Sequence, residues 1–305
     1  MPNQNDAFIL RQLKRPEGPV DVVLDTDTYN EIDDQFALSY MLLSPEKLRV
    51  KAVYAAPFKN DKAASPREGM EKSYEEILRV FKLCGRNDVP AFKGSGHYLP
   101  DESTPVISDA AEDLVKRAHG RSEDNPLYVA AIGAITNVAS AILTDPSIIS
   151  KIVIIFLGGN PLDWKMPEFN LSQDIAAARV VFGCAAPLVQ IPCMGVATHL
   201  TTTEPELREH IRDKSALGKY LYDITCAEAA GYVTEPCWSR VIWDISAVAW
   251  LLSGDFVWDE IQHAPVPSYD QGYVQDVSRH FMKVARYINR DAVFNDLFRK
   301  IAGVK

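Results

Sequence analysis

Five acidic residues lie within ten positions of the sequence, between two apolar segments: Asp25, Asp27, Glu31, Asp33 and Asp34. Asp33 and Asp34 suit a helix N-terminus, but Asp25 and Asp27 end the run VVLDTD, whose composition is typical of a buried strand. Carboxylates crowded at such a place repel one another, so some must be protonated or a cation must lie among them. Oxygen ligands without a His or Cys cluster favour Ca²⁺ or Mg²⁺, so this stretch predicts a divalent-cation site.

Two reaction classes use such a site. One is hydrolysis by a metal-bound water, with a neighbouring Asp as general base. The other is phosphoryl transfer through an aspartyl-phosphate, because VVLDTDT also satisfies the DxDxT pattern of haloacid dehalogenase-like phosphatases. In that alternative the enzyme depends on Mg²⁺, Asp25 is the nucleophile and Asp27 the acid. DxDxT alone is a weak signal, so the phosphatase ranks second.

The elements that must position these acids alternate between strand and helix along the chain. Short β-branched runs (residues 19–25, 48–56, 127–133 and 151–159) alternate with helical segments (33–44, 69–85 and 135–146). This alternation predicts an α/β fold with an open, mainly parallel sheet that carries helices on both faces, as in Rossmann-like proteins. The sequence contains no low-complexity linker and no internal repeat, so we expect a single domain over residues 1–305.

The carboxyl ends of the predicted strands mark the place of the site. Ligands of such sheets gather at these ends. Asp25 and Asp27 end the first predicted strand, and residues 134–137 and 158–160 follow two others. We therefore expect these segments to meet around one ligand.

Composition limits the function classes further. The 305 residues carry a net charge of −9 with scattered Lys and Arg, which disfavours a nucleic-acid partner. Five cysteines without a C-x-x-C pair argue against a disulfide framework and a thiolate zinc site. The N-terminal apolar stretch is too short for a signal peptide, and no apolar run approaches a membrane span. These features predict a cytoplasmic protein that acts on a small molecule, without a membrane partner.

Several segments, in order and spacing, resemble the inosine–uridine type nucleoside hydrolases. DTDTYNEIDDQFAL is similar to the Asp-rich DxDxxxDD loop of that family, and AAIGAITNVASAIL to its GPLTNxA segment. IIFLGG, PEFNLSQDIAAARVVF, VATHLT and VIWDISAVAWLL resemble its MGG, EFNxxxDPxAA, DVTH and HDPxAxA segments. The similarity spans nearly the whole chain. It implies a Rossmann-like fold and Ca²⁺-dependent hydrolysis of the N-glycosidic bond of ribonucleosides, to a free base and ribose.

The resemblance also implies residue roles. Metal ligands would be Asp27, Asp34, Asp244 and the backbone carbonyl of Thr136. Substrate would contact Asn30, Asp33, Asn160, Glu168, Asn170, Trp243 and Asp244. Catalytic roles would fall to Asp27 as the general base that activates water, and to Trp243 and Asn170. Asp25 would be a supporting acid behind the ligands.

The sequence departs from the family pattern at three places. Five residues, TYNEI, separate Asp27 from Asp33, where the usual loop has three. A segment that often reads VAGN reads YAAPF here, and Asn30 is a candidate to replace the missing Asn. Trp243 stands before Asp244 where many members carry His, which resembles the purine-preferring branch of the family. An aromatic wall suits a flat purine, although an apolar helix could also use Trp243 as core.

Two further expectations concern activity and assembly. The altered loop leaves open a non-catalytic protein that binds a ribosyl ligand on the same fold. Members of the family usually assemble, so we expect a homodimer or homotetramer.

Overall fold

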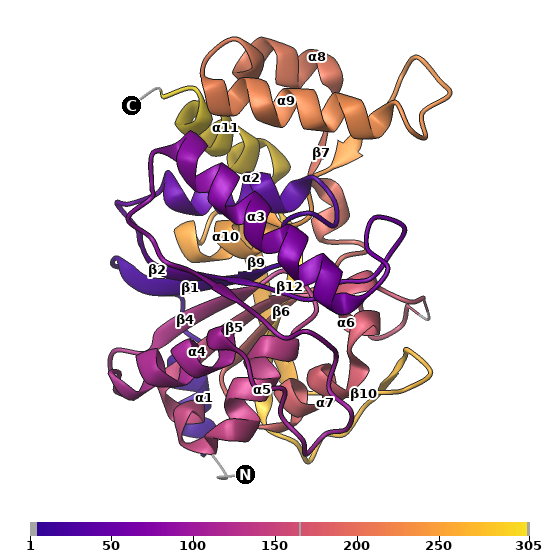
Figure 1. Cartoon of the computed structure of the whole chain (residues 1–305). Coiled ribbons are helices and arrows are strands. Elements are labelled where there is room, and N and C mark those ends of the chain that lie inside the picture. The colour runs from indigo at the N-terminus through magenta and orange to yellow at the C-terminus, as the bar shows by residue number, and fades with distance from the viewer. Residues whose placement is uncertain (1–4, 165, 304–305) are drawn as a thin grey trace.

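The computed structural model describes residues 5–164 and 166–303, and its centre is one eight-stranded sheet (Figure 1). The strand order is β3-β2-β1-β4-β5-β6-β12-β9, and only β9 runs antiparallel to its neighbour. The strands are β1 (Val20–Thr26), β2 (Leu48–Ala55), β3 (Ala91–Lys93), β4 (Leu127–Ala131), β5 (Ile152–Leu157), β6 (Leu188–Ile191), β9 (Val257–His263) and β12 (Phe281–Ile288). The predicted open, mainly parallel sheet is confirmed.

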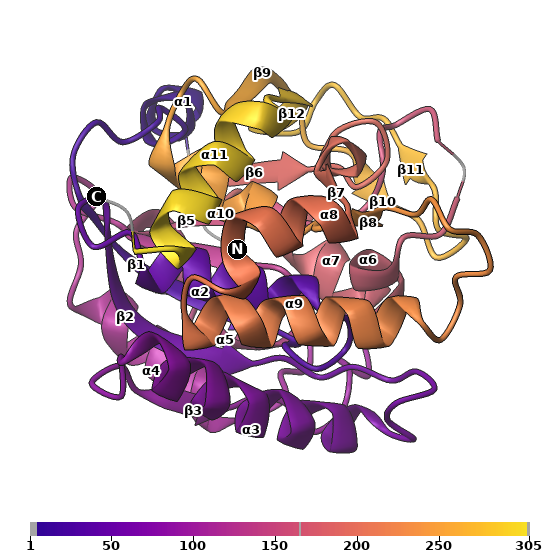
Figure 2. The ribbon, with the colours of Figure 1, turned by 90° about the horizontal axis from the view of Figure 1, so that it is seen from above.

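Helices cover both faces of this sheet (Figure 1). They are α1 (Asp6–Gln12), α2 (Asp33–Leu42), α3 (Pro66–Cys84), α4 (Asp109–His119), α5 (Thr136–Thr144), α6 (Phe169–Gln173), α7 (Ile175–Gly183), α8 (Glu204–Leu207), α9 (Ala216–Ala229), α10 (Ile245–Leu252) and α11 (Arg290–Ile301). One face carries α2, α3, α10 and α11, and the other carries α4, α5 and α7. Seen from above, α8, α9 and α11 lie nearest the viewer, outside α2 (Figure 2). Two short pairs, β7 (Thr201–Thr202) with β8 (Arg240–Val241) and β10 (Val266–Pro267) with β11 (Tyr273–Val274), stand apart from the main sheet.

The central strands are apolar because helices bury them from both sides. All six residues of β5, IVIIFL, are buried, as are all five of β4, LYVAA. Such runs are typical of parallel sheets with both faces covered. The two faces form separate hydrophobic clusters, one with Phe36 and Trp250 and the other with Phe156 and Phe182.

Local signals set the ends of the longest helix as expected. Ser65 caps α3 by accepting a hydrogen bond from the Glu68 amide, and Pro66 follows it. Gly85 ends the helix with φ of 66°, a left-handed conformation that favours glycine. Gly85 is therefore the C-cap of α3.

The elements that were not predicted from the sequence include α1 and the edge strand β9. Asn5 caps α1, and Ile9 and Leu13 insert into the core from a segment whose apolar stretch is short. A cluster around Asp259 of β9 connects these two regions. Asp259 accepts hydrogen bonds from Arg15 and from the Trp250 indole, and it pairs with Lys283 of β12 at 2.7 Å.

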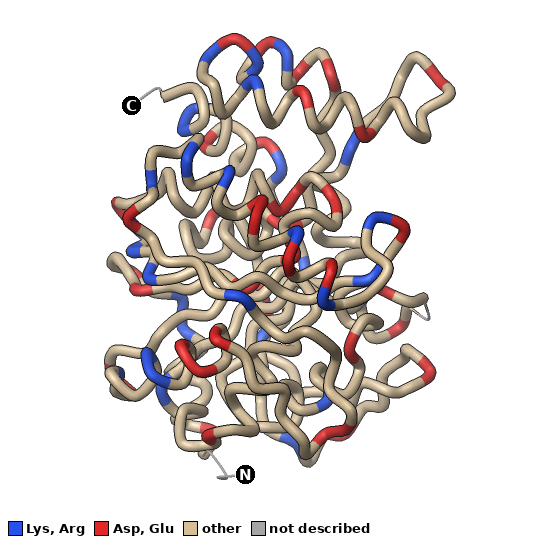
Figure 3. The backbone as a smooth tube through the Cα atoms, in the orientation of Figure 1, with Lys and Arg blue, Asp and Glu red and all other residues tan. Residues whose placement is uncertain are grey.

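The distribution of charged residues and the lengths of the apolar helices give little further information about binding partners. Basic and acidic residues are interspersed along the backbone (Figure 3). Within the described ranges, no helix combines the length and apolarity needed to cross a bilayer. All eight strands of the main sheet come from between residues 20 and 288, while the single-domain organisation of residues 1–305 stays a prediction.

We expect Asp259→Ala to lower the free energy of unfolding by about 3 kcal/mol, because Arg15 and Lys283 would keep poorly solvated charges without their partner. The side chains of Arg15 and Lys283 are each 16% exposed. Urea denaturation measures this change. Glu260→Ala is the matched control on the same strand, because the Glu260 side chain is 57% exposed; its free energy of unfolding should change by less than about 0.5 kcal/mol. Equal losses in the two variants would contradict the assigned role of the Asp259 cluster.

Candidate active site

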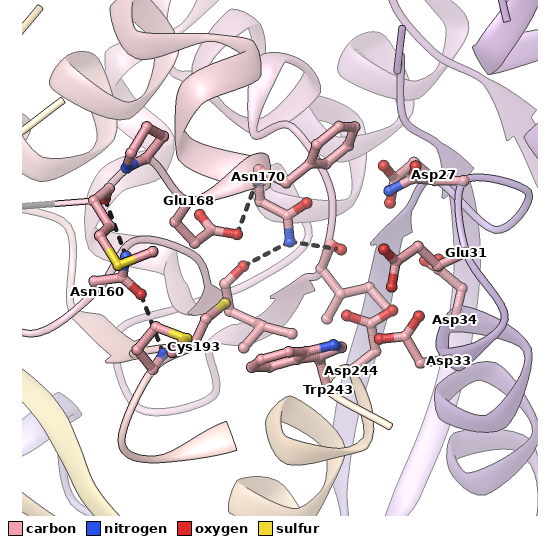
Figure 4. Close-up of a pocket in the computed structure, with 17 residues that line it drawn as sticks. Asp27, Glu31, Asp33, Asp34, Asn160, Glu168, Asn170, Cys193, Trp243 and Asp244 are labelled. Carbon is pink, nitrogen blue, oxygen red and sulfur yellow. Dashed lines mark hydrogen bonds between the residues drawn. The ribbon is translucent and has the colours of Figure 1, made fainter. Parts of the chain in front are cut away.

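A cavity of about 220 Å³ opens at the carboxyl ends of β1, β4 and β5 (Figure 4). Its lining combines segments that lie far apart in the sequence, from Asp27 to Asp244. Carboxylates occupy one side, where Asp27, Asp33 and Asp34 lie near Asp244 (Figure 4). Asn160, Glu168 and Asn170 lie on the other side, so the structure brings together most of the predicted site residues.

The acidic side of the cavity is buried and strongly polar. Asp27, Asp33, Asp34 and Asp244 are at most 4% exposed, and carboxylate oxygens of the last three lie within 4.8 Å of one another. Burial raises the pKa of each, and repulsion between the carboxylates adds to the effect at Asp27 and Asp244. For Asp34 the pKa rises to about 7. These groups would be ionised together only with a cation among them.

The free oxygen of Asp27 fits such a cation. Its Oδ2 is buried and has no hydrogen-bond partner among the described residues. A buried, unpaired carboxylate oxygen is costly unless a ligand satisfies it. The three-carboxylate cluster of Asp33, Asp34 and Asp244 also offers only oxygen donors, which suit Ca²⁺ or Mg²⁺.

The local chain geometry places these acids. β1 ends at Thr26, and the amides of Tyr29 and Asn30 then donate to the Asp27 carbonyl in a tight turn. The Thr26 hydroxyl donates to Asp34, which ties the strand end to the first turn of α2. Asp244 arrives from the other end of the chain as the residue that precedes α10.

Asp25 lies outside the cavity. It is fully buried, and its Oδ1 accepts a 2.8 Å hydrogen bond from the Asn137 amide. A nucleophile has to reach its substrate. The buried position of Asp25 therefore argues against the phosphatase alternative, in which Asp25 is the nucleophile. A supporting role behind Asp27 fits the position and stays a prediction.

Thr136 is also not part of the cavity lining. It is the first residue of α5, and its hydroxyl donates to Asp174 at 2.7 Å. The residue that lines the cavity at the end of β4 is Ile132. Its carbonyl accepts a hydrogen bond from Asn170, which also lines the cavity, whereas Thr136 lies outside the lining. Sequence reasoning missed Ile132 because a backbone carbonyl carries no side-chain signal.

Three polar side chains on the opposite side are held by backbone groups. Asn170 donates both amide hydrogens, to the carbonyls of Ile132 and Leu157, so its oxygen is the group left for a ligand. Glu168 caps α6 and accepts from the amides of Gly159, Asn170 and Leu171. Asn160 donates to the Met166 carbonyl and accepts from the Met194 amide. These bonds fix the side chains before any ligand arrives.

Trp243 lines the cavity between its two sides (Figure 4). It is half-buried and also packs against the core cluster under α10, so it is both wall and core. Asn30 lines the cavity as well, and its oxygen accepts from the Asn60 amide. Sequence reasoning missed Cys193 and Met194, although β6 ends at Ile191 and the carboxyl end of that strand could have indicated them.

Comparison with known proteins gives this cavity its family context. The sequence profile described as "Inosine-uridine preferring nucleoside hydrolase" matches residues 22–295. The pyrimidine-specific ribonucleoside hydrolase RihA of Citrobacter koseri is 29% identical over 183 residues, which are 52% of this chain. The match spans only 55% of the length of that relative. RihA of Salmonella paratyphi B is 26% identical over 264 residues, 76% of this chain and 79% of the relative.

Solved structures share the fold at lower identity. A purine-preferring ribonucleoside hydrolase from Gardnerella vaginalis superposes with a TM-score of 0.76 at 21% identity, and covers 93% of this chain and 98% of its own. A plant nucleoside hydrolase superposes with a TM-score of 0.72 at 20% identity, with 93% and 99% coverage. The profile match and these structures agree with the resemblance seen in the sequence. The chain belongs to the inosine-uridine preferring nucleoside hydrolase family.

Proposed function

We propose that this protein is a Ca²⁺-dependent ribonucleoside hydrolase that cleaves the N-glycosidic bond to give a free base and ribose. The observation that carries the proposal is the unpaired, buried Oδ2 of Asp27 at the edge of a three-carboxylate cluster, opposite the side chains of Asn160, Glu168 and Asn170. This arrangement offers a cation site and a hydroxyl-binding wall within one cavity.

The residues that would hold the cation are Asp27, Asp34 and Asp244, with the Ile132 carbonyl in the place first assigned to Thr136. All are buried and line the cavity. When bound, Ca²⁺ supplies positive charge that orients the ribose hydroxyls and makes a coordinated water more acidic.

Side chains of the protein then accept the proton, bind the sugar hydroxyls and stabilise the developing charge. Asp27 accepts the proton of the attacking water, because its carboxylate lies in the cavity beside the cluster that would hold the cation. Asp33 and the oxygen of Asn170 bind ribose hydroxyls, and Asn160 and Glu168 bind the 5′-hydroxyl. The cleavage develops positive charge on the sugar, and the surrounding carboxylates stabilise it.

Trp243 favours a purine as the leaving base. Its indole forms the floor of the cavity between the acids and the Asn160 side in Figure 4, where a flat base can stack on it. The RihA relatives are named pyrimidine-specific and the Gardnerella vaginalis enzyme purine-preferring, so the names alone do not decide between a purine and a pyrimidine base. A cytoplasmic location and a homodimeric or homotetrameric assembly belong to the same proposal.

Asp27→Asn should lower kcat at least about a thousandfold, because the amide keeps the shape of the carboxylate but cannot take the proton from water. The assay measures free base and reducing sugar from inosine, adenosine, guanosine, uridine and cytidine, with Ca²⁺ or with EDTA. We expect wild-type turnover to stop in EDTA and return with Ca²⁺.

Asp88→Asn is the matched control for Asp27→Asn, because this acid is exposed and lies outside the cavity. It should keep wild-type rates. Turnover by Asp27→Asn at the wild-type rate would contradict the assignment of the general base. Calcium-dependent nucleoside binding without turnover by the wild type would favour a ribosyl-binding protein instead.

Trp243→Ala should raise KM about tenfold for inosine and adenosine and less for uridine, because the larger base loses more stacking area. Trp243→Phe keeps an aromatic ring and should recover most of the loss. Trp258→Ala is the control, since Trp258 is 60% exposed and lies outside the cavity. An equal change of KM for purine and pyrimidine nucleosides would show that Trp243 serves the core rather than the base.

A further inference from the structure

A set of polar contacts, which we name the rim circuit, links four chain segments beside the cavity. Its members are Asn30 and Glu31 of the Asp-rich loop, Asn60 and Lys62 of the loop after β2, Glu228 of α9 and Arg240 of β8. Asn60 donates to Asn30, and Lys62 pairs with Glu228 at 3.3 Å. Arg240 pairs with both Glu228 and Glu31, which connects the segments on both sides.

Arg240 is the centre of the rim circuit. Its Nη2 lies 2.5 Å from Glu31 and 2.9 Å from Glu228, and its side chain is only 16% exposed. An isolated ion pair in water contributes little, but a largely buried guanidinium shared by two carboxylates is held more firmly. Glu31 lines the cavity, and its side chain points toward the carboxylate cluster in Figure 4.

The position of Arg240 in the sequence determines which segments its ion pair with Glu31 connects. Arg240 stands three residues before Trp243, on the short β8 strand that precedes the connection to α10. Glu31 belongs to the five-residue loop TYNEI, whose backbone lies outside helices and strands. One side chain therefore ties the irregular loop on the acidic side of the cavity to the segment that carries Trp243 and Asp244.

We propose that Arg240 is a positioning residue that holds the extended loop 28–32 against the Trp243 segment, and so sets the width of the substrate cavity between Asn30–Glu31 and Trp243. The proposal rests on the proposed function for its effect on nucleosides. It adds an element that neither the acidic motif nor the family profile assigns, because the loop is two residues longer here than the pattern DxDxxxDD.

The consequence should be a loss of binding rather than of chemistry. Asp27, Asp34 and Asp244 are placed by β1, α2 and α10, and the Thr26–Asp34 hydrogen bond ties the first two together. These anchors do not pass through Arg240. Releasing the loop therefore affects the walls that grip the substrate more than the groups that activate water.

The test compares Arg240→Gln, Arg240→Lys and Glu31→Gln with the wild type. Arg240→Gln should raise KM for inosine about tenfold and change kcat less than about twofold, the pattern of lost uniform binding. Arg240→Lys keeps the charge and should recover most of the loss. Glu31→Gln should also raise KM, and the double variant should be no worse than Arg240→Gln alone, because Arg240→Gln already removes the pair with Glu31.

Hydrogen exchange supplies a readout that does not depend on turnover. The amides of residues 28–32 should exchange faster in Arg240→Gln than in the wild type, because the loop loses its tie. Arg208→Gln is the matched control. It removes an arginine whose side chain is 50% exposed and pairs with Glu204 outside the cavity, and it should change neither KM nor exchange in this loop.

Unchanged exchange of residues 28–32 in Arg240→Gln would overturn the proposal, and so would a fall of kcat with KM unchanged. If the wild type hydrolyses no nucleoside, the dissociation constant of inosine, measured by calorimetry, replaces KM. Faster loop exchange in Arg240→Gln without any nucleoside binding by the wild type would retain the tie and reject the hydrolase. Nucleoside hydrolysis by the wild type, with unchanged loop exchange in Arg240→Gln, would support the hydrolase and reject the tie.

Discussion

The repulsion among buried carboxylates is the constraint on which this molecule depends. Asp27, Asp33, Asp34 and Asp244 lie together with almost no exposure, and burial and mutual repulsion both disfavour their ionised forms. Without compensation such a group of charges would weaken the fold or take up protons. A divalent cation, as we propose, would resolve the conflict and turn a cost of burial into a binding site. The chemistry that we propose uses the same property twice, first toward the cation and then toward the charge that develops on the sugar.

The parallel sheet makes this concentration of charge possible. Strands β1, β4, β5 and β6 all end at the same edge, so residues more than 100 positions apart in the chain line one cavity. Helices bury the strands from both sides, which leaves the carboxyl ends as the place for polar side chains. The wall opposite the acids is fixed in advance by backbone hydrogen bonds to Asn160, Glu168 and Asn170. A ligand therefore meets donors and acceptors that are already ordered, which reduces the entropy cost of binding.

Much of this arrangement could be predicted from the sequence, because it depends on local patterns. The β-branched run before Asp25 predicts a buried strand, and Gly85 predicts the end of α3. The family resemblance was confirmed by the profile match, and most of the residues that it assigned line one cavity. The exceptions depend on three-dimensional geometry. Which backbone carbonyl faces the cavity, Ile132 or Thr136, follows from where β4 ends.

Tertiary contacts decide the other features that sequence reasoning missed. Strand β9 lies at the sheet edge and is stabilised through Asp259 by Arg15, more than 240 positions away in the chain. The pairing of Glu31 with Arg240 spans 209 positions, and no local pattern indicates it. Taken separately, the charges of Glu31 and Arg240 are compatible with ordinary solvated loops. Only their proximity in the structure identifies a connection across the cavity.

The central claim is that the acids form a cation site, and calorimetric titration of Ca²⁺ into chelator-treated protein tests it most directly. The account predicts that one ion binds per chain, that binding raises the melting temperature, and that Asp244→Ala abolishes both effects. Heat of binding that Asp244→Ala leaves unchanged would place the ion elsewhere. No heat of binding, together with the same melting temperature in Ca²⁺ and in EDTA, would contradict the claim that these carboxylates gather around a cation.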